Sequence, residues 1–359
     1  MPTRSETLSK AAALRAQFEA HGAVTVEPPI LQPAATLLDL YGEDIRARAY
    51  VTSDALRGEQ MLRPDFTVPV VEMHMRDGAE PARYTYAGEV FRRQEHDPAR
   101  ANEFIQVGYE VFDRINPAAA DAEVFALFAQ ALEGLAVRAF TGDIGVLMAA
   151  VNGLDTTARR KQALMRHIWR PRRFRNLLDR FAGRTPVPAT RTALLAGQVP
   201  CTAPLTGLRT RAEIDARVAA LREDAAAPPL AQGQVALIEA LLDVREVMPH
   251  ALSRLHDLAV DMPQIADAVA RVVTREAALQ ARGVDTGNLV FEASYGRASM
   301  EYYDGFVFGF RAVGRADLPA LASGGRYDAL TRRLGRGAAI PAVGGVMRPG
   351  LMLTVAGVP

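Results

Sequence analysis

Hydrophobic periodicity predicts a change from helix to strand early in the chain. Residues 5–21 carry apolar side chains near helical spacing, which predicts an amphipathic helix. Apolar and polar residues then alternate through 84–93 and through 104–112, on either side of a charged loop. This two-residue period predicts a hairpin of two antiparallel strands with a long connection. A second helical pattern follows from about 118 to 136.

The middle of the chain, residues 155–285, has an almost wholly helical pattern that prolines interrupt repeatedly. Strand patterns return at 288–294 and 301–311. In the second of these strands, one face is expected to hold Phe306, Phe308 and Phe310. The opposite face is expected to hold Tyr303, Gly305 and Gly309.

Strand patterns on both sides of the helical block favour one α+β domain that this block interrupts. We therefore predict a core made of residues 1–150 and 286–359, with a mostly helical insertion at 151–285. The chain contains neither the glycine fingerprint of dinucleotide-binding proteins nor the nucleophile elbow of serine hydrolases.

Composition narrows the possible chemistry. With 49% apolar and 23% charged residues and a net charge of +1, the chain has the balance of a soluble globular protein, and no global field would attract nucleic acid. The only lysines are Lys10 and Lys161, which argues against Schiff-base or general-base lysine chemistry. The single cysteine, Cys201, excludes an internal disulfide and a multi-thiolate zinc site, and we expect neither a metal nor a cofactor. Because the chain has no signal-peptide or membrane-span pattern, we expect a cytoplasmic protein.

The strand around 104–112 carries candidate binding residues. By alternation Gln106, Gly108 and Glu110 share one face, with the amide and the carboxylate about 13 Å apart at roughly 3.3 Å per residue. The glycine between them leaves room for a ligand. The alternative is the solvated outer face of an antiparallel sheet, which this strand alone does not exclude.

Two neighbouring segments add complementary groups. Of the adjacent residues Arg92 and Arg93, one should point to the face of Gln106, where it would clamp the anionic group of an amino acid. Asp65 and Thr67 supply two acceptors at a two-residue spacing that suits an ammonium group. The same residues could instead form a turn and a helix cap.

Five blocks of sequence, in this order, resemble the class II aminoacyl-tRNA synthetase core in its histidyl form. They are RPDFT at 63–67, the strand that ends in Phe91-Arg92, QVGYE at 106–110, EYYDGFVF at 301–308 and SGGRYDAL at 323–330. The resemblance runs from about residue 5 to the C-terminus and is weakest in 155–285. It implies an antiparallel sheet flanked by helices, and a dimer formed through the first motif, here near VEPPILQP at 26–33.

The resemblance also implies a histidine pocket. Asp65 stands where the family has a carboxylate for the histidine ammonium group, and its polar companions are Thr67 and Gln106. Arg92 matches the second-motif arginine that meets the carboxylate or the adenylate phosphate. Glu110 matches the acid that recognises the imidazole, and the tyrosines that line this end of the pocket are Tyr302 and Tyr303. Burying Glu110 without an imidazole partner would be unfavourable.

The chain departs from the synthetases at both catalytic arginines. The family has an arginine four residues before its tyrosine pair; here this position is Ala298, and Arg297 is one residue off. In the third motif, Gly350 and Leu351 replace a glutamate and the arginine that holds the ATP γ-phosphate, although Arg348 lies nearby. Losing one such preorganised charge costs about a hundred- to a thousandfold in rate, so we expect no adenylation activity.

A known group of truncated histidyl-tRNA synthetase paralogues has this profile. Only seven residues follow Met352, whereas the synthetases continue into an anticodon-binding domain. The chain is similar to the regulatory subunits of short-form ATP phosphoribosyltransferase. This resemblance implies a homodimer inside a hetero-oligomer with the catalytic subunit. It also implies that the chain activates this catalytic subunit and takes part in feedback by L-histidine on the first step of histidine biosynthesis.

Two other functions remain open in the sequence. A minimal enzyme could form histidyl-adenylate, against which Leu351 speaks. An RNA-binding surface could lie in 155–184, which carries ten basic residues and Trp169 for base stacking, although a solvated face or a protein-docking surface fits the near-zero net charge better. The sequence leaves open the stoichiometry and whether histidine binds in this pocket or between subunits.

Overall fold

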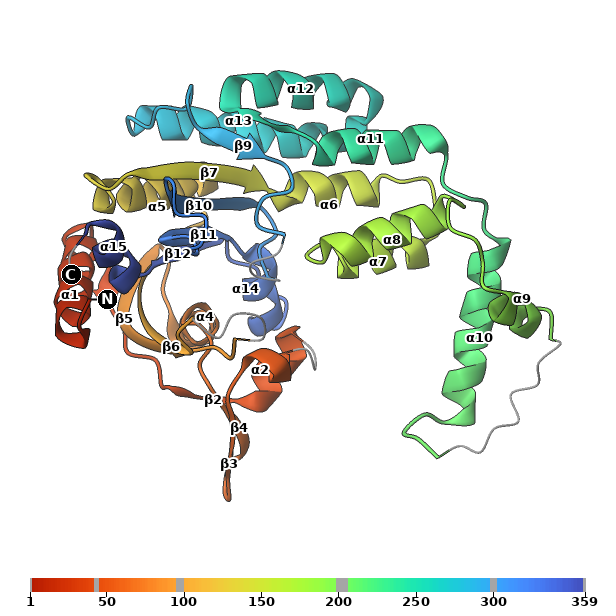
Figure 1. Ribbon diagram of the computed structural model, residues 1–359, viewed down its shortest axis with the longest axis horizontal. Helices are drawn as coiled ribbons and strands as arrows, with labels where there is room; N and C mark the ends of the chain where they lie inside the picture. The colour runs from red at the N-terminus through yellow and green to blue at the C-terminus, as the bar shows by residue number, and fades with distance from the viewer. Residues whose placement is uncertain (1, 42–44, 95–99, 198–205, 298–301, 358–359) are drawn as a thin grey trace.

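A nine-stranded, mostly antiparallel sheet organises the protein. The computed structural model describes residues 2–41, 45–94, 100–197, 206–297 and 302–357 (Figure 1). The strands lie in the order β1 (Val24–Thr25), β5 (Ala82–Phe91), β6 (Glu103–Phe112), β12 (Ala342–Met347), β11 (Ala322–Arg326), β10 (Phe306–Ala312), β7 (Val137–Asp143), β9 (Val290–Glu292) and β8 (Arg245–Val247). Among the strands of the described residues, only the pairs β1–β5 and β7–β9 are parallel.

The predicted hairpin is present, because β5 and β6 pair antiparallel along their whole length. A separate three-stranded sheet has the order β2 (Leu31–Pro33), β4 (Gly58–Leu62) and β3 (Val51–Asp54), and it protrudes at the bottom of Figure 1. The predicted α+β class, an antiparallel sheet with flanking helices, is therefore confirmed.

Helices cover both faces of the sheet near β6. The helices in the first part of the chain are α1 (Arg4–Ala20), α2 (Ala34–Tyr41), α3 (Ile45–Arg48), α4 (Thr67–Asp77) and α5 (Pro117–Ala131), and those at the end are α14 (Asp328–Leu334) and α15 (Pro349–Val355). Of these, α2 packs on the small sheet and on α3. One face packs against α1 and α5, where Tyr109 meets Phe18 and where Phe306, Phe308 and Phe310 surround Phe125 as the two-residue period predicts. We call this the core face. The opposite face lies toward α4 and α14, and we call it the ligand face.

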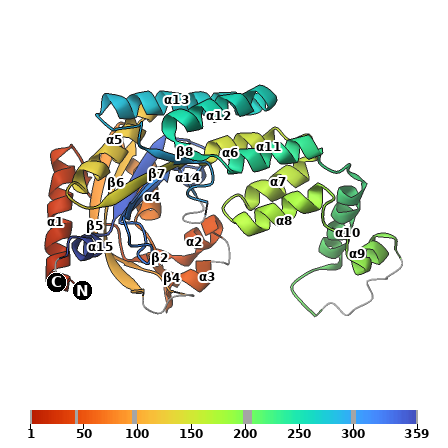
Figure 2. The ribbon, with the colours of Figure 1, turned by 45° about the horizontal axis from the view of Figure 1, so that its top comes forward.

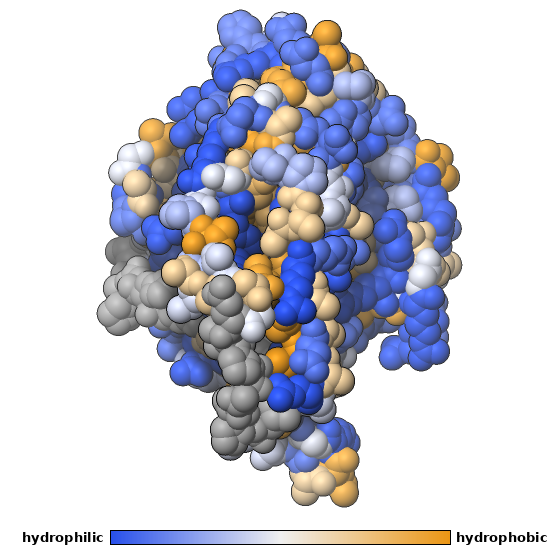
Figure 3. Space-filling view, turned by 90° about the vertical axis from the view of Figure 1, so that its right-hand side faces the viewer, coloured by the Kyte–Doolittle hydropathy of each residue, from blue (hydrophilic) through white to orange (hydrophobic). Residues whose placement is uncertain are grey.

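The helical block divides into two parts. Its helices are α6 (Ile144–Asn152), α7 (Ala158–Arg166), α8 (Pro171–Phe181), α9 (Ala189–Leu195), α10 (Arg211–Ala226), α11 (Gln232–Leu242), α12 (Met248–Asp261), the 3-10 turn η1 (Pro263–Ile265) and α13 (Ala266–Ala281). Helices α9 and α10 project away from the body (Figures 1 and 2), and seen from their side the surface is mostly hydrophilic (Figure 3). By contrast α13 packs on α5, and β8 joins the main sheet, so the second half of the block is part of the core.

Buried ion pairs join the helical block to the sheet. Arg275 of α13 contacts Asp121 at 2.7 Å and Asp143 at 2.9 Å, and Arg326 of β11 contacts Asp121 at 2.6 Å. Each of these four side chains is less than a tenth exposed. Because both arginines share Asp121, α5, α13 and the sheet are held in one arrangement.

One strand assignment was wrong. The pattern predicts strand from residue 301, but β10 begins at Phe306, so Tyr303 and Gly305 are not in the strand. Tertiary hydrogen bonds explain the difference, because Asp304 N–H donates to the Arg326 carbonyl and the Asp304 carboxylate accepts from the backbone amides of Asp328 and Ala329.

No helix in the described ranges is long and apolar enough to cross a membrane.

Candidate functional site

A fully buried carboxylate, Glu110, lies at the centre of the candidate site on the ligand face. Three hydroxyl groups donate to it: Thr67 Oγ1 at 3.0 Å, Tyr86 at 2.8 Å and Tyr327. They come from α4, β5 and the turn before α14. We call Glu110 and these three residues the Glu110 cluster.

Glycines leave space for this cluster. Gly344 is the β12 residue opposite Glu110, and a Cβ atom added there would come within 1.5 Å of Glu110 Oε2. Gly108 makes room in the same way for Tyr86, whose ring would be 2.1 Å from an added Cβ. Since such distances are far below van der Waals contact, only glycine at these positions allows the carboxylate to reach its donors.

Burial raises the pKa of Glu110 from its ordinary 4.5 to about 7. The hydroxyl donors oppose this shift by stabilising the charged form, and the nearby Asp65 charge adds to it. The carboxyl group is therefore protonated over a wider pH range than an exposed glutamate. A ligand that presents an N–H group to it would favour the ionised form.

A second carboxylate, Asp65, is almost fully buried just before α4. It accepts from the Tyr41 hydroxyl and from the Val68 backbone amide, both at 3.3 Å. Burial raises the pKa of Asp65, and the Arg92 charge opposes the rise. Arg92 itself donates to the Pro64 carbonyl at 2.7 Å. The Asp65 side chain thus bonds to the first turn of α4, although the N-cap residue, Phe66, makes no side-chain cap bond. The RPDFT segment also directs a carboxylate and Thr67 toward the ligand face.

The tyrosine pair lies beside both carboxylates. The ring centres of Tyr302 and Tyr303 are 4.9 Å apart with the ring planes at 73°, and the Tyr302 ring is 6.0 Å from that of Tyr327. Burial raises the pKa of Tyr303, and the charges of Glu110 and Asp65 raise it further. The Trp169 indole donates to the Tyr303 carbonyl at 3.2 Å, so the helical block touches the site directly.

The amide of Gln106 is fully buried, yet neither its oxygen nor its nitrogen has a hydrogen-bond partner within the described residues. Gln106 shares the ligand face with Glu110 by strand alternation. The alternative of a solvated outer face is therefore wrong for this strand, because helices cover both of its sides. Leaving a buried amide unpaired costs about 1–3 kcal/mol.

The structure brings most of the predicted residues together. Thr67 bonds to Glu110, and the Arg92 charge lowers the pKa of Asp65. The Asp65 charge in turn adds to the raised pKa of Tyr302 and of Tyr303. Sequence reasoning did not assign Tyr41, Tyr86 and Tyr327 to the site. Gly88 lies opposite Gln106 on the neighbouring strand, and Tyr86 is two residues before it, so strand alternation would have placed Tyr86 on the ligand face. Tyr327 belongs to the SGGRYDAL block.

The two candidate replacement arginines have different surroundings. Arg297 donates to the Ile168 carbonyl at 2.7 Å and lies 4.8 Å from the Phe174 ring, so it faces α7 and α8. Arg348 donates to the Ala320 carbonyl at 2.6 Å and shares the Phe104 ring with Arg92, each at 5.7 Å. Burial, with Arg92 and Arg100 nearby, lowers the pKa of Arg348 to about 9. Ala298 and Cys201 lie outside the described residues.

Within the described ranges, no group of three or more His, Cys, Asp and Glu side chains has an arrangement that could hold a metal ion. The site instead combines two buried carboxylates, one guanidinium group and several phenols. Such a set can bind a small zwitterion with one further N–H donor through charge-assisted hydrogen bonds.

Sequence comparisons place this site in context. A family model described as histidyl-tRNA synthetase matches residues 2–349. ATP phosphoribosyltransferase regulatory subunits from Brucella anthropi and Brucella ovis are 32% and 31% identical to the chain over 354 residues, covering 92% of it and 93% of each relative.

Solved structures share the fold. An ATP phosphoribosyltransferase regulatory subunit/histidyl-tRNA synthetase from Bacillus halodurans aligns with a TM-score of 0.69 and 20% identity over 98% of this chain and 79% of its own. A histidine–tRNA ligase subunit from Alicyclobacillus acidocaldarius aligns with a TM-score of 0.62 and 22% identity, over 98% and 93% of the two chains.

Proposed function

This chain belongs to the ATP phosphoribosyltransferase regulatory subunits, a histidyl-tRNA synthetase-like family, and we propose that it activates a short-form catalytic subunit and conveys inhibition by L-histidine to it. Its role is regulatory and belongs to histidine biosynthesis. The names of the curated relatives agree with the predicted absence of synthetase activity. We propose that the protein carries out this regulation in the cytoplasm.

The observation that carries the proposal is the unpaired amide of Gln106, on the same face of β6 as the Glu110 cluster. A folded protein tolerates a buried amide without partners when a ligand completes its hydrogen bonds. Glu110 would accept from the imidazole, Asp65 and Thr67 would hold the ammonium group, and Arg92 would meet the carboxylate. Tyr302 and Tyr303 would line the imidazole end of the site.

The surroundings of the arginines favour binding without chemistry. Arg297 is directed to α7 and α8, away from the two carboxylates. Arg348 is oriented by the Ala320 carbonyl, and in place of the third-motif arginine stands Leu351 in α15. Histidine bound here would lack the positive charges that ATP activation requires.

We further propose that the chain forms a homodimer through the small sheet and the segment before it. Apolar side chains are exposed there, with Leu31 at 49%, Val51 at 43% and Leu56 at 93%. Exposed apolar side chains on one small element are typical of a protein–protein interface. These residues lie in or beside the 26–33 segment and the β3–β4 hairpin.

A site that binds histidine without reacting affects the cell only if it shifts another equilibrium. We expect histidine to oppose activation of the catalytic subunit with a coupling free energy of about 1–3 kcal/mol, or roughly 5- to 150-fold in affinity between the two states. By reciprocity, assembly of the inhibited complex would tighten histidine binding by the same factor.

The test is to mix the purified subunits and to measure phosphoribosyl-ATP formation with and without histidine, while light scattering follows assembly. We expect a complex with a higher turnover that histidine suppresses. A mixture that forms no complex and shows no change in rate would contradict the proposal. If a complex forms but its rate does not respond to histidine, the proposed sensing of histidine is wrong and the proposed activation stands.

A further inference from the structure

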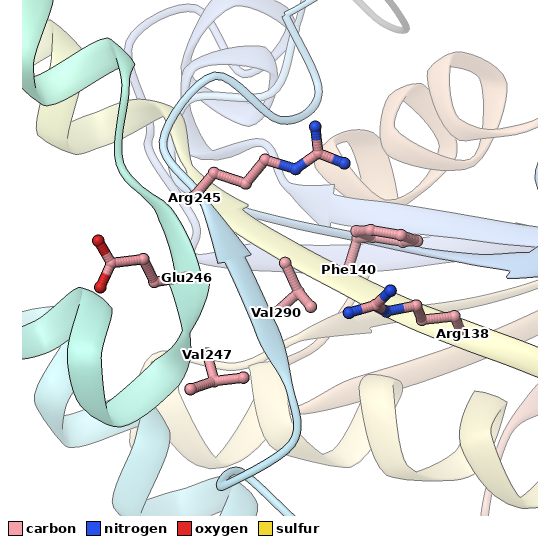
Figure 4. A pocket seen from close by; sticks show the side chains of 6 residues that line it. All are labelled: Arg138, Phe140, Arg245, Glu246, Val247 and Val290. Carbon is pink, nitrogen blue, oxygen red and sulfur yellow. The ribbon is translucent and has the colours of Figure 1, made fainter.

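A basic concave surface lies on the main sheet, outside the candidate site. Its floor is apolar and consists of Phe140, Val247 and Val290, and the guanidinium groups of Arg138 and Arg245 lie on either side (Figure 4). We call it the β8 edge surface, because β8 is the last strand of the sheet. The cavity between the two arginines has a volume of about 170 Å³.

The β8 edge surface is on the ligand face of the sheet. Phe140 pairs with Val290 on β9 and with Gly309 on β10, and Val290 pairs with Val247 on β8. Residues paired in this way project to the same side. The ring of Phe140 stacks on that of Tyr295, with an interplanar angle of 8° and 6.1 Å between the ring centres.

Positive charge is concentrated here without matching carboxylates. Arg138 on β7 lies directly opposite Arg311 on β10, and both are exposed. Among the described residues neither forms an ion pair with a carboxylate. Like charges directly opposite on neighbouring strands destabilise a sheet. An anionic partner would remove this repulsion.

The carboxylates close by do not supply that partner. Glu292 contacts Arg245 at 3.6 Å, but the Arg245 side chain is 67% exposed, so the pair is weak. Glu246 also lines the cavity, but its carboxylate contacts Arg254 at 3.1 Å (Figure 4). The surface therefore keeps an excess of positive charge.

The size of the cavity decides what it can hold. Pockets for small ligands usually enclose about 300–1,000 Å³, so 170 Å³ is too small for a nucleotide. It fits one apolar side chain of another protein. Arginine and aromatic residues around a small apolar pocket are typical of the energetic centre of protein interfaces.

We propose that the β8 edge surface docks an acidic segment of the catalytic subunit, with one apolar side chain between Arg138 and Arg245 and carboxylates paired to Arg138 and Arg311. This inference rests on the proposed function. β8 and β1 form opposite edges of the nine-stranded sheet, and the small sheet proposed for the homodimer lies at the other end of the molecule (Figure 1). Both interfaces can therefore be occupied at the same time.

The experiment compares the wild type with the double variant Arg138→Glu/Arg311→Glu in binding to the catalytic subunit by calorimetry at two salt concentrations. We expect the variant to bind at least about 30-fold more weakly, because like charges replace opposite ones across the interface. The matched control is Arg217→Glu/Arg222→Glu on α10, since both arginines are exposed and the net charge changes equally, and this control should keep the wild-type affinity. An unchanged melting temperature and histidine affinity would establish that the double variant is folded.

Hydrogen exchange of the wild-type complex gives a second measurement. Peptides from β7 and β8 should become protected when the catalytic subunit binds. If the wild type binds and the double variant binds equally well, the docking surface is wrong although the proposed function stands. If the wild type does not bind, the docking surface and the proposed function are both wrong. If the double variant instead loses its homodimer, the surface belongs to a second copy of this chain and the proposal is overturned.

Discussion

The phenol of Tyr327 donates a hydrogen bond to the carboxylate of Glu110, 217 residues earlier in the chain. The bond joins the turn before α14 to the middle of β6 and fixes one oxygen of the carboxylate. Thr67 and Tyr86 donate to the other oxygen. Glu110 is therefore oriented before a ligand arrives, which lowers the free energy needed to order the site on binding.

Replacing Glu110 with glutamine should weaken histidine binding by about 1.5–3 kcal/mol, the range for hydrogen bonds to charged groups. The reason is that the neutral amide keeps the shape of the side chain and loses the charge that the imidazole meets. Calorimetry measures the affinity, with Glu133→Gln on the exposed surface as the control. Equal affinities of the wild type and Glu110→Gln would show that histidine does not use this carboxylate.

The stability of the ligand-free protein should depend on pH through Glu110. Because burial raises its pKa from 4.5 to about 7, the folded state keeps a proton that the unfolded state releases. The contribution of this proton to the free energy of unfolding is fully present below pH 4.5. It is lost as the pH rises through about 7, and the loss amounts to up to about 3 kcal/mol.

Urea unfolding at several pH values between 4.5 and 8 tests this dependence. The free energy of unfolding of the wild type should fall with rising pH relative to that of Glu110→Gln, which cannot ionise. Asp304, whose burial raises its pKa to about 7, contributes with the same sign in both proteins and cancels in the comparison. Parallel curves for the two proteins would mean that Glu110 does not titrate in this range.

The isolated protein should not catalyse histidine-dependent exchange of pyrophosphate into ATP. The two positions that hold catalytic arginines in the synthetases are Ala298 and Leu351 here. The assay follows labelled pyrophosphate entering ATP, with an active histidyl-tRNA synthetase as the positive control. Exchange above background that Arg92→Ala abolishes would revive the adenylating enzyme.

Removing the shared partner of two buried arginines should destabilise the fold strongly. Asp121→Ala leaves Arg275 and Arg326 buried without this carboxylate, and breaking such a pair costs about 3–5 kcal/mol. Urea unfolding measures the loss. Asp317→Ala removes an exposed pair with Arg315 and should leave the stability almost unchanged. Similar effects of the two substitutions would contradict a structural role for the buried network.

The sequence by itself determined the order of the elements and the main residues of the candidate site. Strand alternation placed Gln106 and Glu110 on one face, because successive side chains of a strand point to opposite sides whatever surrounds them. The five sequence blocks identified the family, since each places particular side chains at fixed local spacings. The same alternation predicted that residues 84–93 and 104–112 are the two strands of a hairpin.

Only the tertiary structure decided what covers each face. Periodicity cannot tell a solvated face from one closed by a helix, so the burial of Gln106 and the raised pKa of Glu110 follow from the packing of α4 and α14. The Tyr327 bond, the Asp121 network and the opposed pair of Arg138 and Arg311 join residues far apart in the chain. Such contacts depend on strand order and register across the whole sheet, which local spacing does not encode.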